Sequence, residues 1–70
     1  MMPLGYATAG EDNVILRVGG TPEMKKHLED MGFVTGAVVS VVSTVSGNLI
    51  VNVKDTKVAL DKQLAMKIMI

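Results

Sequence analysis

Residues 28–36, which read LEDMGFVTG, decide the fold because they join a helical pattern to an extended one. One apolar stripe recurs at helical spacing: Met24, Leu28 and Met31. Gly32 then supplies the left-handed residue that ends many helices. Phe33, just beyond it, is placed to contact Leu28, as in a Schellman motif. The sequence therefore predicts a helix over 22–31 that ends at Gly32.

The start of this helix is marked as clearly as its end. Thr21 is a suitable N-cap, and Pro22 fits the first turn, where the missing N–H has no intrahelical partner to lose. Glu23 places a negative charge at the positive end of the helix dipole. These three residues predict that the helix begins at Pro22.

Extended patterns lie on both sides of the helix. Five short strands are predicted, over 13–18, 37–43, 49–53, 58–60 and 66–70. A turn at 46–48 makes a hairpin, and Asp61 is expected to cap a single helical turn that ends at Ala65. Five short strands with one helix after the first predict a mainly β fold, namely a small, strongly curved five-stranded barrel.

The strands carry apolar residues on both faces. In the first strand, alternation places Val14, Leu16 and Val18 on one face and Ile15 and Arg17 on the other. A barrel this small buries only one face of each strand. The other face is either covered by the helix and the N-terminal segment or left as a patch for another protein, and both alternatives stay open.

Composition excludes several classes of protein. The chain has 70 residues and no cysteine, 49% of its residues are hydrophobic, and its mean hydropathy is +0.39. It is therefore too apolar for a disordered tail. Seven Lys and Arg cancel seven Asp and Glu, and only Tyr6 and Phe33 are aromatic, so the basic surface and stacking rings of a nucleic-acid binder are missing. Without cysteine there is no disulfide, thiolate zinc site or cysteine nucleophile.

The apolar residues are not arranged as a membrane segment. The longest uncharged stretch, 33–53, is interrupted by polar residues and by a turn. The N-terminus lacks the basic and apolar regions of a signal peptide. We therefore expect one domain over residues 1–70, in the cytoplasm and without direct membrane insertion. Its excess of apolar residues suggests that some of them contact a partner.

Few residues in this chain carry chemistry. No acid, base and nucleophile converge in a recognisable pattern, so no enzyme activity is predicted. Glu23, His27 and Asp30 fall at i, i+4 and i+7 on the helix, and one imidazole with two carboxylates is a possible weak site for Fe(II) or another divalent transition metal. The alternative is that these three residues form an ordinary solvated face, which amphipathic helices commonly have.

The sequence resembles a known family along nearly its whole length. The segments that carry the resemblance are NVILRVGG (13–20), KKHLEDMGFVTG (25–36), VVSVV (38–42), VAL (58–60) and LAMKI (64–68). They are similar to the FeoA family of bacterial ferrous iron transport proteins, and residues 28–36 are the most specific part. Thr35 departs from the family, which often has proline before the glycine, although either residue suits a turn into a strand.

This resemblance implies an SH3-like β-barrel with one helix inserted after the first strand. It also implies a non-enzymatic, cytosolic accessory of FeoB, the GTP-binding membrane transporter that imports ferrous iron. Residues predicted to contact this partner are the exposed helix residues and the outward valines of the hairpin: Lys25, Lys26, Glu29, Val39 and Val41. A homo-oligomer is also compatible with the sequence. The alternative function is a regulatory or metal-sensing module like the SH3-like C-terminal domain of iron- or manganese-dependent repressors.

Overall fold

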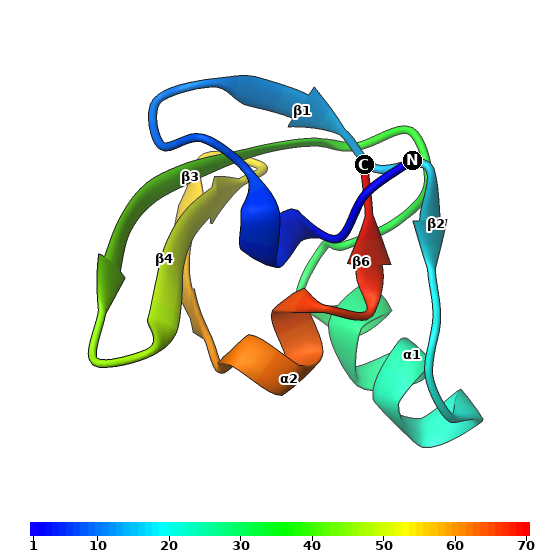
Figure 1. The fold of residues 1–70 in the computed structure, drawn as a ribbon. Helices are drawn as coiled ribbons and strands as arrows, with labels where there is room; N and C mark the ends of the chain where they lie inside the picture. The colour runs from blue at the N-terminus through cyan, green and yellow to red at the C-terminus, as the bar shows by residue number, and fades with distance from the viewer.

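The computed structural model describes all 70 residues and forms mainly β structure. The elements in chain order are the 3-10 helix η1 (Leu4–Tyr6), β1 (Asp12–Val14), β2 (Arg17–Val18), α1 (Pro22–Asp30), β3 (Val38–Val45), β4 (Asn48–Val53), β5 (Thr56–Leu60), α2 (Lys62–Ala65) and β6 (Ile68–Met69). Figure 1 shows the strands wrapped around a common interior, with α1 and α2 at one end. The predicted mainly β fold with α1 after the early strands is confirmed.

The strands form two separate antiparallel sheets. One sheet has four strands in the order β1-β3-β4-β5, and the other pairs β2 with β6. The prediction of a five-stranded barrel is therefore wrong in detail, because the chain has six strands and neither sheet closes on itself. The cause is a break in the predicted strand 13–18, whose first part joins β3 and whose second part joins β6.

This break also changes which side chains of the segment face the core. Ile15 and Val18 are buried, whereas Val14 is 50% and Leu16 52% exposed. The predicted alternation, with Val14, Leu16 and Val18 on one face, is therefore wrong. Between the two strands, the N–H of Ile15 donates to Ala37 O and that of Leu16 donates to Met69 O. The backbone thus passes from one sheet to the other within two residues.

Helix α1 begins and ends as its sequence predicts. The Thr21 Oγ1 accepts a hydrogen bond from the Met24 N–H at 3.2 Å, which makes Thr21 the N-cap. At the other end Gly32 has φ +102°, and the Phe33 N–H donates to Leu28 O at 3.0 Å. This bond is the 6→1 bond of a Schellman motif. The helix itself stops one residue earlier than predicted, at Asp30.

A single hydrophobic cluster lies between the two sheets and the helices. It contains thirteen buried residues: Leu4, Ile15, Val18, Leu28, Phe33, Val39, Val41, Leu49, Val51, Val53, Leu60, Ala65 and Ile68. Leu4 reaches it from η1, an element that the sequence does not predict, and is completely buried. Tyr6 in the same short helix stays outside and is 65% exposed. Thus one face of η1 closes the core and the other faces solvent.

The predicted connections around the hairpins are confirmed. Ser46 and Gly47 both have positive φ, as in the two-residue type I′ turns that suit the twist of a hairpin. The Asp61 Oδ1 accepts a hydrogen bond from the Leu64 N–H at 2.8 Å and so caps α2. Neither α1 nor α2 is long and apolar enough to cross a membrane.

Candidate functional site

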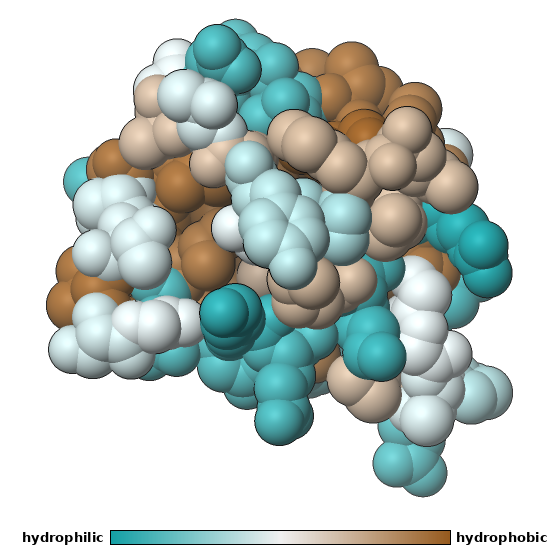
Figure 2. Space-filling view, in the orientation of Figure 1, coloured by the Kyte–Doolittle hydropathy of each residue, from teal (hydrophilic) through white to brown (hydrophobic).

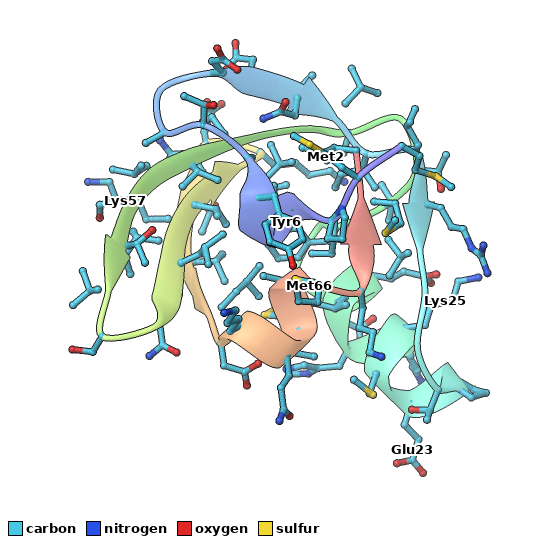
Figure 3. The ribbon with its side chains drawn as sticks, in the orientation of Figure 1. Met2, Tyr6, Glu23, Lys25, Lys57 and Met66 are labelled. Carbon is cyan, nitrogen blue, oxygen red and sulfur yellow. The ribbon has the colours of Figure 1, made fainter.

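A groove lies between the strand β2 and the helix α1. β2 contributes Arg17 and Val18 to its lining, α1 contributes Lys25 and Glu29, and Thr35 comes from the segment that follows the helix. We call this hollow, of about 350 Å³, the β2–α1 groove. Figure 3 shows Lys25 beside β2, although its backbone belongs to α1. Segments that are distant in sequence therefore meet at one surface.

The charge of the β2–α1 groove is positive on a chain that is neutral overall. Arg17 and Lys25 are cations and Glu29 is the only carboxylate in the lining, so the local charge is +1 (two minus one). All three side chains are exposed. Exposed cations on two walls favour a ligand that carries negative charge.

A second hollow lies on the outer face of the four-stranded sheet and has the opposite character. Its volume is about 570 Å³, and its charged residues are Asp12, Lys54 and Asp55. Ser40 and Asn52 are opposite each other in the β3–β4 ladder and add polar groups to its floor. The local charge here is −1, so the two hollows would attract different ligands.

The residues predicted to contact a partner divide into two groups. Lys25, Lys26 and Glu29 are exposed on α1 as expected, and Lys25 and Glu29 lie in the β2–α1 groove. Val39 and Val41 do not face outward, so this part of the prediction is wrong: they belong to the core. In the β3–β4 ladder they stand opposite the buried residues Val53 and Val51, which places all four on the inner face.

The valines that do face outward are their neighbours. Val38 is 52% exposed and lies directly opposite the half-exposed Val14 in the β1–β3 ladder. Val42 sits at an irregularity in the β3–β4 register and is also exposed, as is Val45 near the end of β3. Figure 2 shows apolar side chains gathered along β3 and β4 and again around the end of β1. The outer face of β3 therefore does carry exposed apolar surface, but Val38, Val42 and Val45 form it instead of Val39 and Val41.

This assignment of faces can be tested with one pair of substitutions. Val39→Thr places a hydroxyl in the core and is expected to lower the free energy of unfolding by about 1–3 kcal/mol. Val38→Thr makes the same chemical change on the outer face and is expected to stay within about 0.5 kcal/mol of the parent. Urea unfolding followed by circular dichroism measures both. Equal losses for the two variants would contradict the assignment.

The predicted metal ligands do not form a cluster. Glu23, His27 and Asp30 are all exposed on α1, and no three His, Cys, Asp or Glu side chains in the protein are grouped so that they could hold a metal ion. The reason is the length of the helix between them. At about 1.5 Å rise per residue, Glu23 and Asp30 are separated by about 10 Å along the helix axis. The ligand atoms of one ion lie within about 4–5 Å of one another, twice a bond of about 2.0–2.6 Å, and these side chains are not grouped in that way.

Comparison with known proteins assigns the chain to a family. The profile of the FeoA domain family matches residues 2–70. The chain belongs to the FeoA family. This confirms the resemblance carried by residues 28–36 and their flanking strands. FeoA proteins are non-enzymatic accessory proteins, and the prediction that the chain is not an enzyme is confirmed with the family.

Individual relatives agree with the family. A protein of Methanocaldococcus jannaschii named as a candidate Fe(2+) transport protein A is 30% identical over 70 residues, which are all of this chain and 85% of the relative. A crystal structure of an iron uptake regulatory protein, FeoA, is 26% identical with a TM-score of 0.89, over 97% of this chain and 90% of the other. FeoA of Stenotrophomonas maltophilia, described as an SH3 domain protein and solved with zinc, has a TM-score of 0.86 at 24% identity, over 99% and 88%. The fold is therefore SH3-like.

A manganese-dependent transcriptional repressor contains the same fold. Its structure has a TM-score of 0.85 with this chain at 19% identity, over 94% of this chain but only 38% of the repressor. Such a likeness concerns the fold alone. It shows that a domain of this fold also occurs as part of a larger protein.

The sequence did not single out the β2–α1 groove of this FeoA-family protein. From its sequence position alone, Arg17 is expected only on a strand face and Thr35 only in a turn. The groove depends on β2 leaving β1 and pairing with β6, which is a tertiary event. One signal was present: Arg17 is the only charged residue in the apolar segment 13–20, and such a residue needs an exposed position.

Proposed function

We propose that this protein is a non-enzymatic accessory of ferrous iron uptake that docks on the cytoplasmic part of a GTP-binding membrane transporter of the FeoB type. The observation that carries the proposal is the FeoA family match over residues 2–70. The M. jannaschii relative is named for Fe(2+) transport, and the structure with 26% identity is named for iron uptake regulation. Both names place relatives of this chain in iron uptake.

The surface of the protein has features that suit binding to another protein. Val14 and Val38 are half-exposed and adjacent on the outer face of the β1–β3 pair. Leu16, also half-exposed, leads from there to the β2–α1 groove, where Arg17 and Lys25 add charge. Protein interfaces commonly combine apolar contact with a polar, charged surround. Such surface serves binding rather than a chemical step.

The alternative function, a regulatory module of a metal-dependent repressor, has the fold in its favour. The repressor likeness is at 19% identity, however, and this chain corresponds to only 38% of that protein. The FeoA profile and the 30% identical relative both point to transport. A neighbouring gene for a polytopic GTP-binding protein would support the accessory role, whereas one for a winged-helix regulator would support the alternative.

A cellular measurement tests the proposed function. Cells that lack this protein but retain the transporter are expected to take up radioactive Fe(II) severalfold more slowly, and a plasmid copy is expected to restore the rate. Uptake that is unchanged by the deletion, in cells whose Fe(II) uptake depends on the transporter, would contradict the proposal. A copy with a disrupted core, such as Phe33→Ala, serves as the control for folded protein.

A further inference from the structure

We propose that the β2–α1 groove binds an acidic segment of a partner protein in extended conformation, which adds as a third strand beside β2. This inference rests on the proposed function, because it specifies which kind of segment of the docking partner the groove would bind. It is nevertheless tested without the transporter, so its failure leaves the docking itself in place. Three features of the groove support it: a free strand edge, a hollow beside that edge, and a cation on each wall.

The first feature is the free edge of β2. The strand, Arg17–Val18, has only one neighbour, β6. Directly after β2 the Gly19 N–H donates to Lys67 O at 2.8 Å, and directly before it, where the chain leaves β1, the Leu16 N–H donates to Met69 O at 2.8 Å. Successive backbone groups of a strand point to opposite sides. Because the Gly19 N–H points to β6 and Val18 precedes it in the pair with Ile68, the N–H and C=O of Val18 point away from β6. A strand edge of this kind is a template for another extended chain.

The second feature is the hollow into which this edge faces. Val18 places its side chain in the core, yet the residue also lines the groove, with Lys25 and Glu29 of α1 across from it. Neither α1 nor the segment at Val34 and Thr35 accepts a backbone hydrogen bond from Val18. The Val18 N–H therefore has no backbone acceptor on the groove side, although the residue as a whole is only 6% exposed. Figure 1 shows β2 at the rim of the molecule, with β6 on one side and α1 below.

The third feature is the charge that frames this edge. Arg17 lies on the strand wall and Lys25 on the helix wall, and both are exposed beside the single carboxylate of Glu29. Cations on both sides of an extended chain favour acidic side chains in that chain. They disfavour a basic segment by like-charge repulsion. The edge itself is short, because Gly20 turns the chain with φ +96° directly after it, so only a few residues of the partner pair with it.

The experiment uses a defined probe and the intact chain. The probe is an acetylated and amidated pentapeptide of alternating glutamate and threonine, titrated into ¹⁵N-labelled protein and followed by NMR. We expect saturable shifts concentrated at residues 16–20 and at Lys25, Glu29 and Thr35. The exchange of the Val18 amide hydrogen with D₂O is expected to slow at least about fivefold at saturation, because strand addition gives it an acceptor. Shifts without slower exchange of Val18 would overturn strand addition.

Matched controls separate the groove from general charge effects. Arg17→Glu combined with Lys25→Glu is expected to weaken peptide binding at least about tenfold. Lys57→Glu combined with Lys62→Glu makes the same change in net charge at exposed positions of β5 and α2, outside the groove, and is expected to have little effect. The same peptide with lysine in place of glutamate is expected not to bind.

Three outcomes would overturn the proposal. One is the absence of saturable shifts with the acidic peptide. Another is equal weakening by the two charge-reversed pairs, which would mean that the peptide senses only overall charge. The third is that the same shifts arise when the protein alone is concentrated, because the free edge of β2 would then be an interface between copies of this chain.

Discussion

Replacing Phe33 by alanine is expected to leave the protein largely unfolded at room temperature. Phe33 is completely buried, it is the largest side chain in the core, and its N–H closes the Schellman motif of α1. Truncating a buried phenylalanine costs about 3–5 kcal/mol. A chain of this length has a total stability of about 4–10 kcal/mol, at the lower end if its core is small. A core of only thirteen buried residues places the total near the lower end of this range, where a loss of this size removes nearly all of the stability.

The measurement is urea unfolding followed by far-ultraviolet circular dichroism, with Tyr6→Ala as the matched control. Tyr6 is the only other aromatic residue and is 65% exposed, so its truncation is expected to change the free energy of unfolding by less than about 0.5 kcal/mol. If Phe33→Ala kept most of the parent stability, the core would not be centred on this side chain.

Gly32→Val is expected to have the second-largest effect, a loss of about 2–3 kcal/mol. Gly32 has φ +102°, and a left-handed conformation costs an ordinary L-residue about 1–2 kcal/mol, and a β-branched one more. A Cβ at this position would also lie 3.4 Å from the Lys54 Cδ and 3.8 Å from the Val53 Cγ2. These are ordinary contact distances, so the expected loss comes from the backbone strain of a β-branched residue at the end of α1.

Two further glycine variants make this result specific, and thermal or urea unfolding measures all three. Gly32→Ala keeps the strain of the left-handed residue without the branched side chain, so it is expected to lose about 1–2 kcal/mol. Gly19→Ala places its Cβ in ordinary contact with Lys67 O at 3.6 Å and is expected to be nearly neutral. A neutral Gly32→Val would show that the helix does not end in a left-handed residue.

Local signals in the sequence were sufficient for the elements whose structure is determined by neighbouring residues. The cap at Thr21, the left-handed Gly32, the turn at Ser46 and the cap at Asp61 all depend on contacts within about one helical turn or one hairpin. The residue types at these positions therefore carry the information. The family resemblance in residues 28–36 adds the SH3-like arrangement of these pieces.

The five-stranded barrel and the outward position of Val39 and Val41 are wrong predictions for a common reason. Both depend on which strand pairs with which, and alternation alone does not show where a chain changes sheet. The segment 13–18 reads as one strand, but Ile15 and Val18 are both buried because the backbone turns between β1 and β2. In β3 both faces carry valine, so only the register with β4 decides that Val39 faces the core and Val38 the solvent.

The candidate site was predicted only where it depends on the helix. The spacing of α1 exposes Lys25 and Glu29, and both lie in the β2–α1 groove. Arg17 and Thr35 complete the groove from segments that meet α1 only after folding. For the proposed metal ligands, the helical spacing was read correctly, but it does not bring the side chains together. Glu23, His27 and Asp30 share a helical stripe, but two turns of helix separate the first from the last.

Binding of the protein to its transporter tests the proposed docking most directly. The full-length GTP-binding ferrous iron transporter, purified in lipid nanodiscs, is immobilised and titrated with this protein in the presence of GDP, a non-hydrolysable GTP analogue or neither, each with and without Fe(II). Docking predicts saturable binding in at least one of these conditions, retained by Tyr6→Ala and lost with the unfolded Phe33→Ala variant. No detectable binding of the folded protein in any condition would contradict it.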